Sequence, residues 1–166
     1  MFLIVAPLST MSNWHNEFAR YACLLFRFTP AIPTLLYHGA KNERTSLQKK
    51  VDPEKVSVVI TSYEIVIRDR QFLSRLPWKF IVVDEGHRLK NLNCRYGTVC
   101  CLSRLLRELK QFKTGNRLIL TGTPLHVCRV LTQNNLAELW SLLNFVLPDI
   151  FDDLATFEQW YVNSLT

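Results

Sequence analysis

The chain has 166 residues, of which 48% are hydrophobic, and a formal net charge of +6. This length corresponds to one domain with enough apolar residues for a sizeable core, and no run of about 18 apolar residues offers a membrane span. The basic charge is compatible with a nucleic-acid partner without requiring one. The cysteines number five and include the adjacent pair Cys100 and Cys101, which suits neither a complete disulfide framework nor a paired zinc motif.

Short apolar runs alternate with helical patterns along the chain. The predicted strands cover residues 2–6, 34–37, 56–61, 80–84 and 117–121, and the predicted helices cover 12–28, 41–50, 63–70, 99–112, 135–145 and 156–162. Strands that alternate with helices at this spacing indicate βαβ units. The sequence therefore predicts an α/β fold in which helices cover both faces of a parallel sheet.

Two acidic residues, Asp84 and Glu85, follow directly after the apolar run at 80–83. In open α/β sheets, ligands bind just beyond the carboxyl ends of the strands. One acid at such an edge could hold Mg²⁺ while the other orients a water molecule. On these residues alone, a strand that ends in two solvated acids remains the alternative.

A second polar turn, Thr121-Gly122-Thr123-Pro124, ends the apolar run at 117–120. Gly permits a backbone turn with positive φ, and Pro cannot continue a strand ladder. The two threonine hydroxyls are therefore expected at the same sheet edge as the acids.

In this order, Asp84-Glu85-Gly86-His87 and Thr121-Gly122-Thr123-Pro124 resemble motifs II and III of superfamily-two helicases. Segments 2–10, 60–64 and 139–145 further resemble the Swi/Snf-type chromatin-remodelling ATPases. The likeness covers nearly the whole chain and implies a RecA-like fold. It also implies the domain division: residues 1–166 form a partial helicase ATP-binding lobe, with an α/β part at 1–125 and an insertion with following helices at 126–166.

The resemblance assigns catalytic and cofactor-binding roles. It implies that Asp84 holds the Mg²⁺ of bound ATP, mainly through water, and that Glu85 polarises the attacking water. His87 would hydrogen-bond toward the nucleotide or toward a partner lobe, and a structural role for it is the alternative. Phosphoryl transfer depends mainly on positioning and charge neutralisation, so loss of either carboxylate should slow it by orders of magnitude.

The resemblance also implies residues that contact DNA and residues that couple DNA to the nucleotide. Pro7, Ser9 and Thr10 would contact the phosphates of one DNA strand, as would Thr61 and Ser62. Without the resemblance, either segment would be interpreted as a helix cap. Coupling between the nucleotide state and the nucleic-acid groove is assigned to Thr121, Gly122 and Thr123, for which turn capping is the alternative. The implied partners are double-stranded DNA, nucleosomes and a second RecA-like lobe, and the implied location is the nucleus.

Two tryptophans, Trp14 and Trp140, stand near these motifs. We expect both to be core anchors rather than base-stacking platforms.

No G-x-x-x-x-G-K-[ST] phosphate loop occurs among the five glycines of the chain. The resemblance places this loop before strand 2–6 and supplies arginine fingers from a second lobe, so we expect a fragment that binds ATP poorly and hydrolyses it negligibly. A catalytically inactive truncated form that binds DNA or a protein partner is the alternative. The missing segment is also expected to pair beside strand 80–84, which would otherwise present an exposed apolar edge.

Three segments interrupt the family pattern, at 19–27, 96–103 and 126–132. They contain four of the five cysteines, which indicates inserted sequence rather than a metal site. The third segment would displace Gln133 and Asn134 from the motif III turn.

Overall fold

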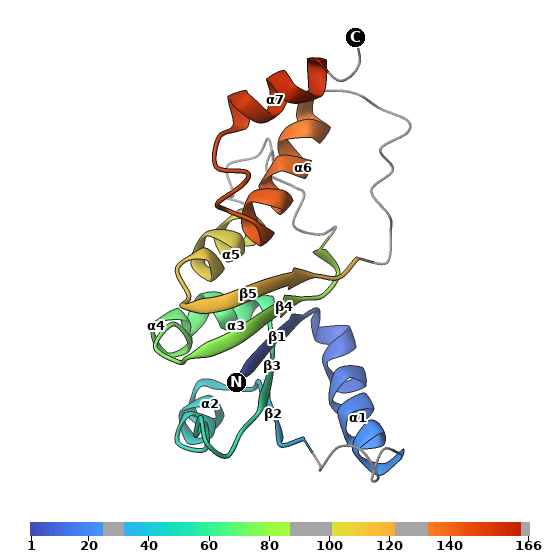
Figure 1. Cartoon of the computed structure of the whole chain (residues 1–166). Coiled ribbons are helices and arrows are strands. Elements are labelled where there is room, and N and C mark those ends of the chain that lie inside the picture. Colours follow the sequence, from blue (N-terminus) through green and yellow to red (C-terminus); the bar gives the residue numbers. More distant parts are fainter. Residues whose placement is uncertain (25–31, 87–100, 122–132, 164–166) are drawn as a thin grey trace.

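The computed structural model describes residues 1–24, 32–86, 101–121 and 133–163. Within them lies one five-stranded parallel sheet with the order β2-β3-β1-β4-β5 (Figure 1). The strands are β1 (Phe2–Ala6), β2 (Thr34–Tyr37), β3 (Val58–Ser62), β4 (Trp78–Val83) and β5 (Thr114–Ile119). The predicted fold class is confirmed, and each predicted strand exists within a few residues of its expected position.

The two central strands explain why the sheet forms. Every residue of β3 is buried, as is every residue of β1 after Phe2. Continuous apolar runs of this kind are typical of parallel strands covered on both faces. Strand β1 pairs with β3 on one side and with β4 on the other, so it lies in the middle of the sheet.

The position of β4 corrects one expectation. We expected a strand from outside this chain to pair beside residues 80–84, but β1 and β5 occupy both sides of β4. The edge strands of the described sheet are β2 and β5. The expectation was wrong because strand order depends on how crossover helices pack, and the apolar run alone does not record it.

The helices cover both faces of the sheet. Helix α1 (Leu8–Leu24) lies on one face, where Met11 packs with Ile4 and Ile60 in a small cluster. Figure 1 shows the next helices on the other face. They are α2 (Lys41–Gln48), α3 (Tyr63–Arg68), α4 (Arg70–Leu73) and α5 (Cys101–Lys110).

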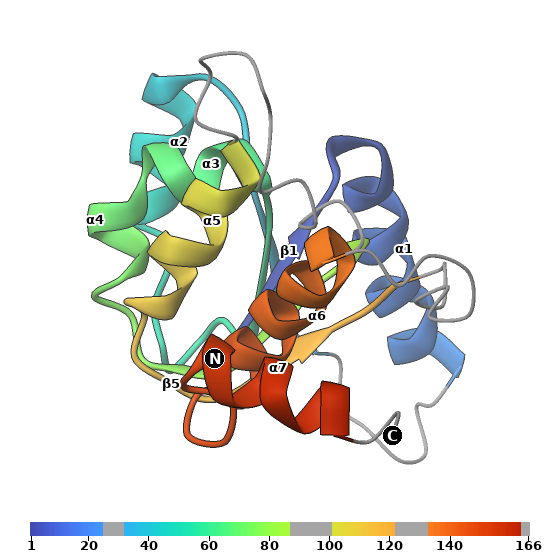
Figure 2. The ribbon, with the colours of Figure 1, turned by 90° about the horizontal axis from the view of Figure 1, so that it is seen from above.

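The main core cluster lies under α3 and α5. It joins Val66 and Leu105 to the sheet residues Leu3 and Ile81, all of which are buried. The last helices, α6 (Gln133–Val146) and α7 (Leu154–Asn163), lie beyond β5 (Figures 1 and 2). Helix α6 adds Phe145 to the same core, with no exposed surface. None of the described helices is long and apolar enough to cross a membrane.

Two helix boundaries differ from the prediction. Helix α1 begins at Leu8, four residues early, because Pro7 ends the strand ladder and its carbonyl accepts the Thr10 N–H at 3.0 Å. The predicted helix at 63–70 is split at Asp69, whose φ of −106° and ψ of 26° are not helical. Residues 25–28 of the predicted helix at 12–28 and residues 99–100 of the predicted helix at 99–112 lie outside the described residues.

Candidate functional site

The carboxyl ends of four strands meet at one edge of the sheet. Ala6 is in register with Ser62, and Val83 is in register with both Val5 and Ile119. The residues that follow these strands therefore share this edge, as the sequence predicts. The turn after β1, the start of α3, the two acids after β4 and the segment after β5 all converge there.

Asp84 accepts hydrogen bonds from several of the segments that meet at this edge. Its Oδ2 atom accepts the indole N–H of Trp14 at 2.9 Å and the hydroxyl of Thr10 at 3.4 Å. Its Oδ1 atom accepts the backbone N–H of Glu85 at 2.8 Å. Its own backbone N–H donates to the Val5 carbonyl at 2.8 Å, which extends the pairing of β4 with β1 by one residue. The carboxylate is thus held by a helix and by its own turn.

Glu85 adopts an unusual backbone conformation. Its φ of 51° lies in the left-handed region, which a non-glycine residue rarely adopts. Such conformations are found mostly where surrounding contacts enforce them, and they concentrate at functional sites. The side chain is half-buried, and Glu85 directly follows Asp84 in the turn that ends β4.

Gly86 brings the β4 turn against the end of β5. Its N–H donates to the Leu120 carbonyl at 2.7 Å, and the Leu120 N–H donates to the Val83 carbonyl at 2.8 Å. A Cβ atom on Gly86 would lie 2.0 Å from Cγ2 of Ile119, so only glycine fits this approach. Thr121, the next residue after Leu120, is exposed beside the acids. His87, Gly122 and Thr123 lie outside the described residues.

Three predicted DNA contacts lie at the start of α1, counting Pro7, the residue before it. Pro7 is buried, and its carbonyl accepts both the N–H and the hydroxyl of Thr10, the latter at 3.1 Å. Ser9 is exposed and Thr10 is half-buried. The structure therefore presents Ser9 and the start of the helix to solvent, directly beside Asp84.

The second predicted segment, Thr61 and Ser62, is less accessible. Thr61 is fully buried, and its hydroxyl donates to the Tyr37 carbonyl of β2 at 2.9 Å. Ser62, which precedes α3, has only 6% of its surface exposed. Thr61 does not present its hydroxyl to the surface, because the hydroxyl is hydrogen-bonded to the neighbouring strand β2. Only the start of α3 reaches the edge.

Sequence reasoning missed two side chains that hold Asp84. Trp14 is half-buried and packs beside Phe18, with ring centroids 6.1 Å apart, as expected of a core anchor, but it also donates to the carboxylate. The Tyr63 hydroxyl donates to the Asp84 carbonyl. A signal for Trp14 was present: it lies one helical turn after Thr10 on the same face of α1, and a buried indole N–H needs an acceptor.

The acids fit a magnesium ion that arrives with a phosphate ligand. Among the described residues, no group of three or more His, Cys, Asp or Glu side chains could hold a metal ion. Mg²⁺ is commonly held by one or two carboxylates together with water and substrate phosphates rather than by a dedicated cage. Asp84 and Glu85 supply the one or two carboxylates that such a site requires.

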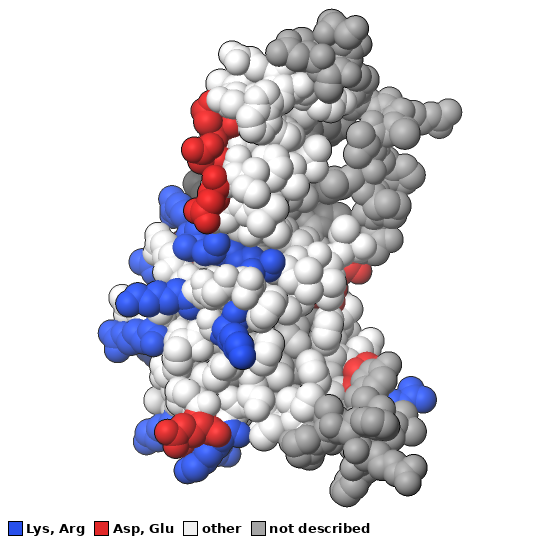
Figure 3. Space-filling model, in the orientation of Figure 1, with Lys and Arg blue, Asp and Glu red and all other residues white. Residues whose placement is uncertain are grey.

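Among the described residues, the basic side chains on the face shown in Figure 3 do not gather at this edge. One group of them forms a band over α4, α5 and the beginnings of β4 and β5, and acidic side chains lie beside the band over the segment that joins α6 to α7. Exposed Lys79 and Lys113 stand at those strand beginnings. The band therefore lies at the other end of the strands from Asp84.

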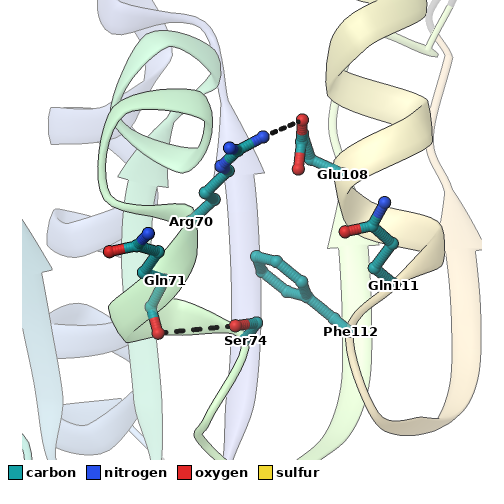
Figure 4. Close-up of a pocket in the computed structure, with 6 residues that line it drawn as sticks. All are labelled: Arg70, Gln71, Ser74, Glu108, Gln111 and Phe112. Carbon is teal, nitrogen blue, oxygen red and sulfur yellow. Dashed lines mark hydrogen bonds and ion pairs between the residues drawn. The ribbon is translucent and has the colours of Figure 1, made fainter.

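A shallow hollow of about 270 Å³ lies between α4 and α5 (Figure 4). Arg70 and Glu108 pair across it at 2.8 Å, and only 2% of the Glu108 side chain is exposed. None of the predicted site residues lines this hollow, which is bounded by Arg70, Gln71, Ser74, Glu108, Gln111 and Phe112. Its ion pair links two helices, and the hollow is separate from the carboxyl edge of the sheet.

Comparison with known proteins shows the family to which the chain belongs. The SNF2-related domain family matches residues 1–166. Human "Lymphoid-specific helicase" is 51% identical over 165 residues, which is 96% of this chain and 17% of that protein. Arabidopsis thaliana "ATP-dependent DNA helicase DDM1" is 50% identical, over 96% of this chain and 19% of its own length. The chain spans a fifth or less of the length of these curated relatives.

The fold comparison agrees with these relatives. The SWI2/SNF2 ATPase core of Sulfolobus solfataricus, solved in complex with dsDNA, matches with a TM-score of 0.64 and 26% identity. The match covers 95% of this chain and 27% of that one. The fold is thus the RecA-like fold of the SWI2/SNF2 ATPase cores, and the likeness to lymphoid-specific helicase that segments 88–91 and 147–153 indicate is confirmed.

Proposed function

The chain belongs to the SNF2-related domain family, and from this premise we propose that it is part of the N-terminal motor lobe of an ATP-dependent DNA translocase that remodels chromatin. The observation that carries the proposal is the convergence at one sheet edge. Asp84 and Glu85 lie there beside the exposed first turn of α1 and the segment that follows β5. This is the arrangement expected where a metal–nucleotide site adjoins a phosphate-contacting surface.

The proposal assigns a role to each of the predicted nucleotide-site residues. Asp84 would hold the Mg²⁺ of ATP, mainly through water, and Glu85 would orient the attacking water. The ion would neutralise charge on the transferring phosphoryl group. His87 would complete the nucleotide contacts, and the segment formed by Thr121, Gly122 and Thr123 would couple them to the nucleic-acid groove.

The DNA groove in this proposal is centred on α1. Ser9 and the free N–H groups of the first helical turn would contact phosphates, because a helix N-terminus favours anions. Ser62, directly before α3, would bring the start of that helix to the DNA phosphates. Thr61 would act indirectly, because its hydrogen bond to the Tyr37 carbonyl fixes β3 to β2. The proposed partners are double-stranded DNA in nucleosomes and a second RecA-like lobe, and the proposed location is the nucleus.

Duplex binding tests the proposal with a matched pair of variants. Ser9→Glu places a negative charge in the first turn of α1, where acidic residues suit the helix dipole but repel a phosphate. Ser46→Glu makes the same change in net charge on exposed α2. We expect Ser9→Glu to weaken duplex binding in 50 mM salt about fivefold, the effect of roughly 1 kcal/mol between charges about 4 Å apart in water.

Fluorescence anisotropy with a labelled duplex measures both affinities, and the Ser46→Glu variant should bind within about twofold of the unmodified chain. Wild-type affinity should also fall steeply between 50 and 200 mM salt, because phosphate contacts release counterions. Equal weakening by the two variants would assign the binding to net charge and remove α1 from the proposed groove.

A binding role without catalysis, toward DNA or a protein partner, is the second candidate. The sequence contains no G-x-x-x-x-G-K-[ST] loop, which would supply the lysine that neutralises the β- and γ-phosphates. The intact mass of the native protein, captured through residues 149–166, separates the two candidates. A product much larger than 19.4 kDa supports the motor, whereas a product of 19.4 kDa supports the binding role.

A further inference from the structure

The Asp84 carboxylate is attached to α1 by two side chains of one helix face. Trp14 and Thr10 are four residues apart, so their side chains lie one above the other on the helix. Both donate to Oδ2 of Asp84, at 2.9 and 3.4 Å, although 70 and 74 positions of sequence separate them from it. A displacement of the start of α1 would therefore act directly on this carboxylate.

Counting acceptor sites shows what these donors leave available. An ionised carboxylate offers about four lone-pair directions, two on each oxygen. Trp14 takes one direction on Oδ2, Thr10 lies 3.4 Å from the same oxygen, and the Glu85 N–H takes one direction on Oδ1 at 2.8 Å. Among the contacts of the described residues, the remaining direction is on Oδ1. The donors from α1 thus select which oxygen of Asp84 can accept a further ligand or water.

The Thr10 hydroxyl is shared between two acceptors. It has one proton, and it lies 3.1 Å from the Pro7 carbonyl and 3.4 Å from Oδ2 of Asp84. One proton cannot serve both at full strength. A phosphate at the first turn of α1 would compete for the same proton and leave the Trp14 indole as the main support of Oδ2.

The backbone of Asp84 is also held from the neighbouring segment. The Tyr63 hydroxyl donates to its carbonyl, and Tyr63 is the first residue of α3, directly after Ser62. Both segments that are proposed to contact phosphates therefore reach the same acidic residue by direct hydrogen bonds.

We propose that Trp14 is a positioning residue that couples phosphate binding at the first turn of α1 to the orientation of the Asp84 carboxylate. This inference rests on the proposed DNA contact at α1. The indole N–H is a fixed donor, because its ring is packed beside Phe18. The Thr10 hydroxyl, one turn earlier, is a donor that can turn from Asp84 to another acceptor.

The indole N–H resonances of the chain test this coupling. The sequence has four tryptophans, and Trp78 provides an internal control because its buried indole donates to the Leu73 carbonyl at 2.8 Å. With ¹⁵N-labelled indoles, Trp14→Phe assigns the Trp14 resonance while keeping an aromatic ring beside Phe18. In the absence of DNA, Asp84→Asn should shift the Trp14 resonance upfield, because the bond loses its charged acceptor, and should leave the Trp78 resonance in place.

Addition of a duplex oligonucleotide in 50 mM salt is the decisive step. We expect the duplex to shift the Trp14 resonance and leave the Trp78 resonance unchanged. Duplex affinities of Trp14→Phe, Asp84→Asn and the double variant should be non-additive, because the two side chains act through one bond. A purely structural role for Trp14 would produce neither the selective shift nor the non-additivity.

The possible failures are distinguishable. If the duplex binds with the expected salt dependence but the Trp14 resonance does not move, the coupling is wrong and the proposed function stands. If Asp84→Asn leaves the Trp14 resonance unchanged, the hydrogen bond is absent and the inference is overturned without any reference to DNA. If no duplex binds, the anisotropy measurement shows that the proposed function has failed, and the coupling fails with it.

Discussion

Gly86 connects the acidic turn to the end of β5 at the scale of single residues. A Cβ atom there would lie 2.0 Å from Cγ2 of Ile119, closer than side chains approach one another. Gly86→Ala should therefore force the β4 turn away from β5 and lower the free energy of unfolding by roughly 1–3 kcal/mol. Urea denaturation followed by circular dichroism measures the loss.

Gly115 supplies the control for this substitution. It is exposed in β5, and an added Cβ atom would be 3.5 Å from the Lys79 carbonyl, an ordinary contact. Gly115→Ala should change the free energy of unfolding by no more than about 0.5 kcal/mol. Similar losses in both variants would mean that the close approach at Gly86 does not exist.

Single residues also show how far sequence reasoning reached. Asp84 and Glu85 could be located because they directly follow an apolar run, and the end of a strand is a local property of sequence. Thr61 was expected to contact phosphates, but it donates to the Tyr37 carbonyl inside the sheet. That bond depends on which strand lies beside β3, and the residues around Thr61 do not record it.

At the scale of elements, a buried polar network joins α2 to the junction of α3 and α4. Arg44 donates to Asp69 at 2.7 Å, and the Tyr37 hydroxyl donates to the same carboxylate at 2.6 Å. Burial and the bond to Asp69 raise the pKa of Tyr37 to about 12. Burial alone would raise the pKa of Asp69, but the bonds from Arg44 and Tyr37 outweigh it and lower that pKa. The network is centred on Asp69, the residue at which the predicted helix at 63–70 is interrupted.

This network predicts a pH dependence at alkaline pH. The pKa of Tyr37 is about 12 in the folded chain and about 10 when unfolded. Its contribution is thus fully present below pH 10 and is lost as pH rises through 12. The difference in free energy of unfolding between wild type and Tyr37→Phe should be constant up to pH 9 and narrow toward pH 12.

Urea denaturation of both proteins at several pH values measures this difference. The comparison cancels the titration of lysine side chains, which both proteins share. Parallel stability profiles for the two proteins over this range would contradict the assignment of the shift to Tyr37.

At the scale of the whole molecule, α6 packs the C-terminal helices against the α/β part of the chain. Phe145 is fully buried in the main core, and the Arg117 guanidinium of β5 lies 5.5 Å from its ring centroid. Lys110 at the end of α5 also donates to Asn144 of α6. We therefore expect residues 1–121 and α6 to unfold as one cooperative unit.

Truncation of the buried ring tests this unit. Phe145→Ala should lower the free energy of unfolding of the whole chain by about 3–5 kcal/mol, as expected for a cavity in the core. Trp160→Ala on α7 is the control, because 58% of Trp160 is exposed, and it should change stability by less than about 1 kcal/mol. A separate early transition for α6 in chemical denaturation would show that residues 126–166 form a distinct unit.

The sequence by itself determined the α/β class, the positions of the strands and the two acids that end β4. These properties are local, because the periodicity of apolar residues, the turn residues and the motif spacing all depend on residues that are close in sequence. Only the tertiary structure decided that β4 lies between β1 and β5, and that Trp14 and Thr10 hold Asp84. Strand order and contacts across 70 positions depend on how helices pack over the sheet, and no local pattern encodes that packing.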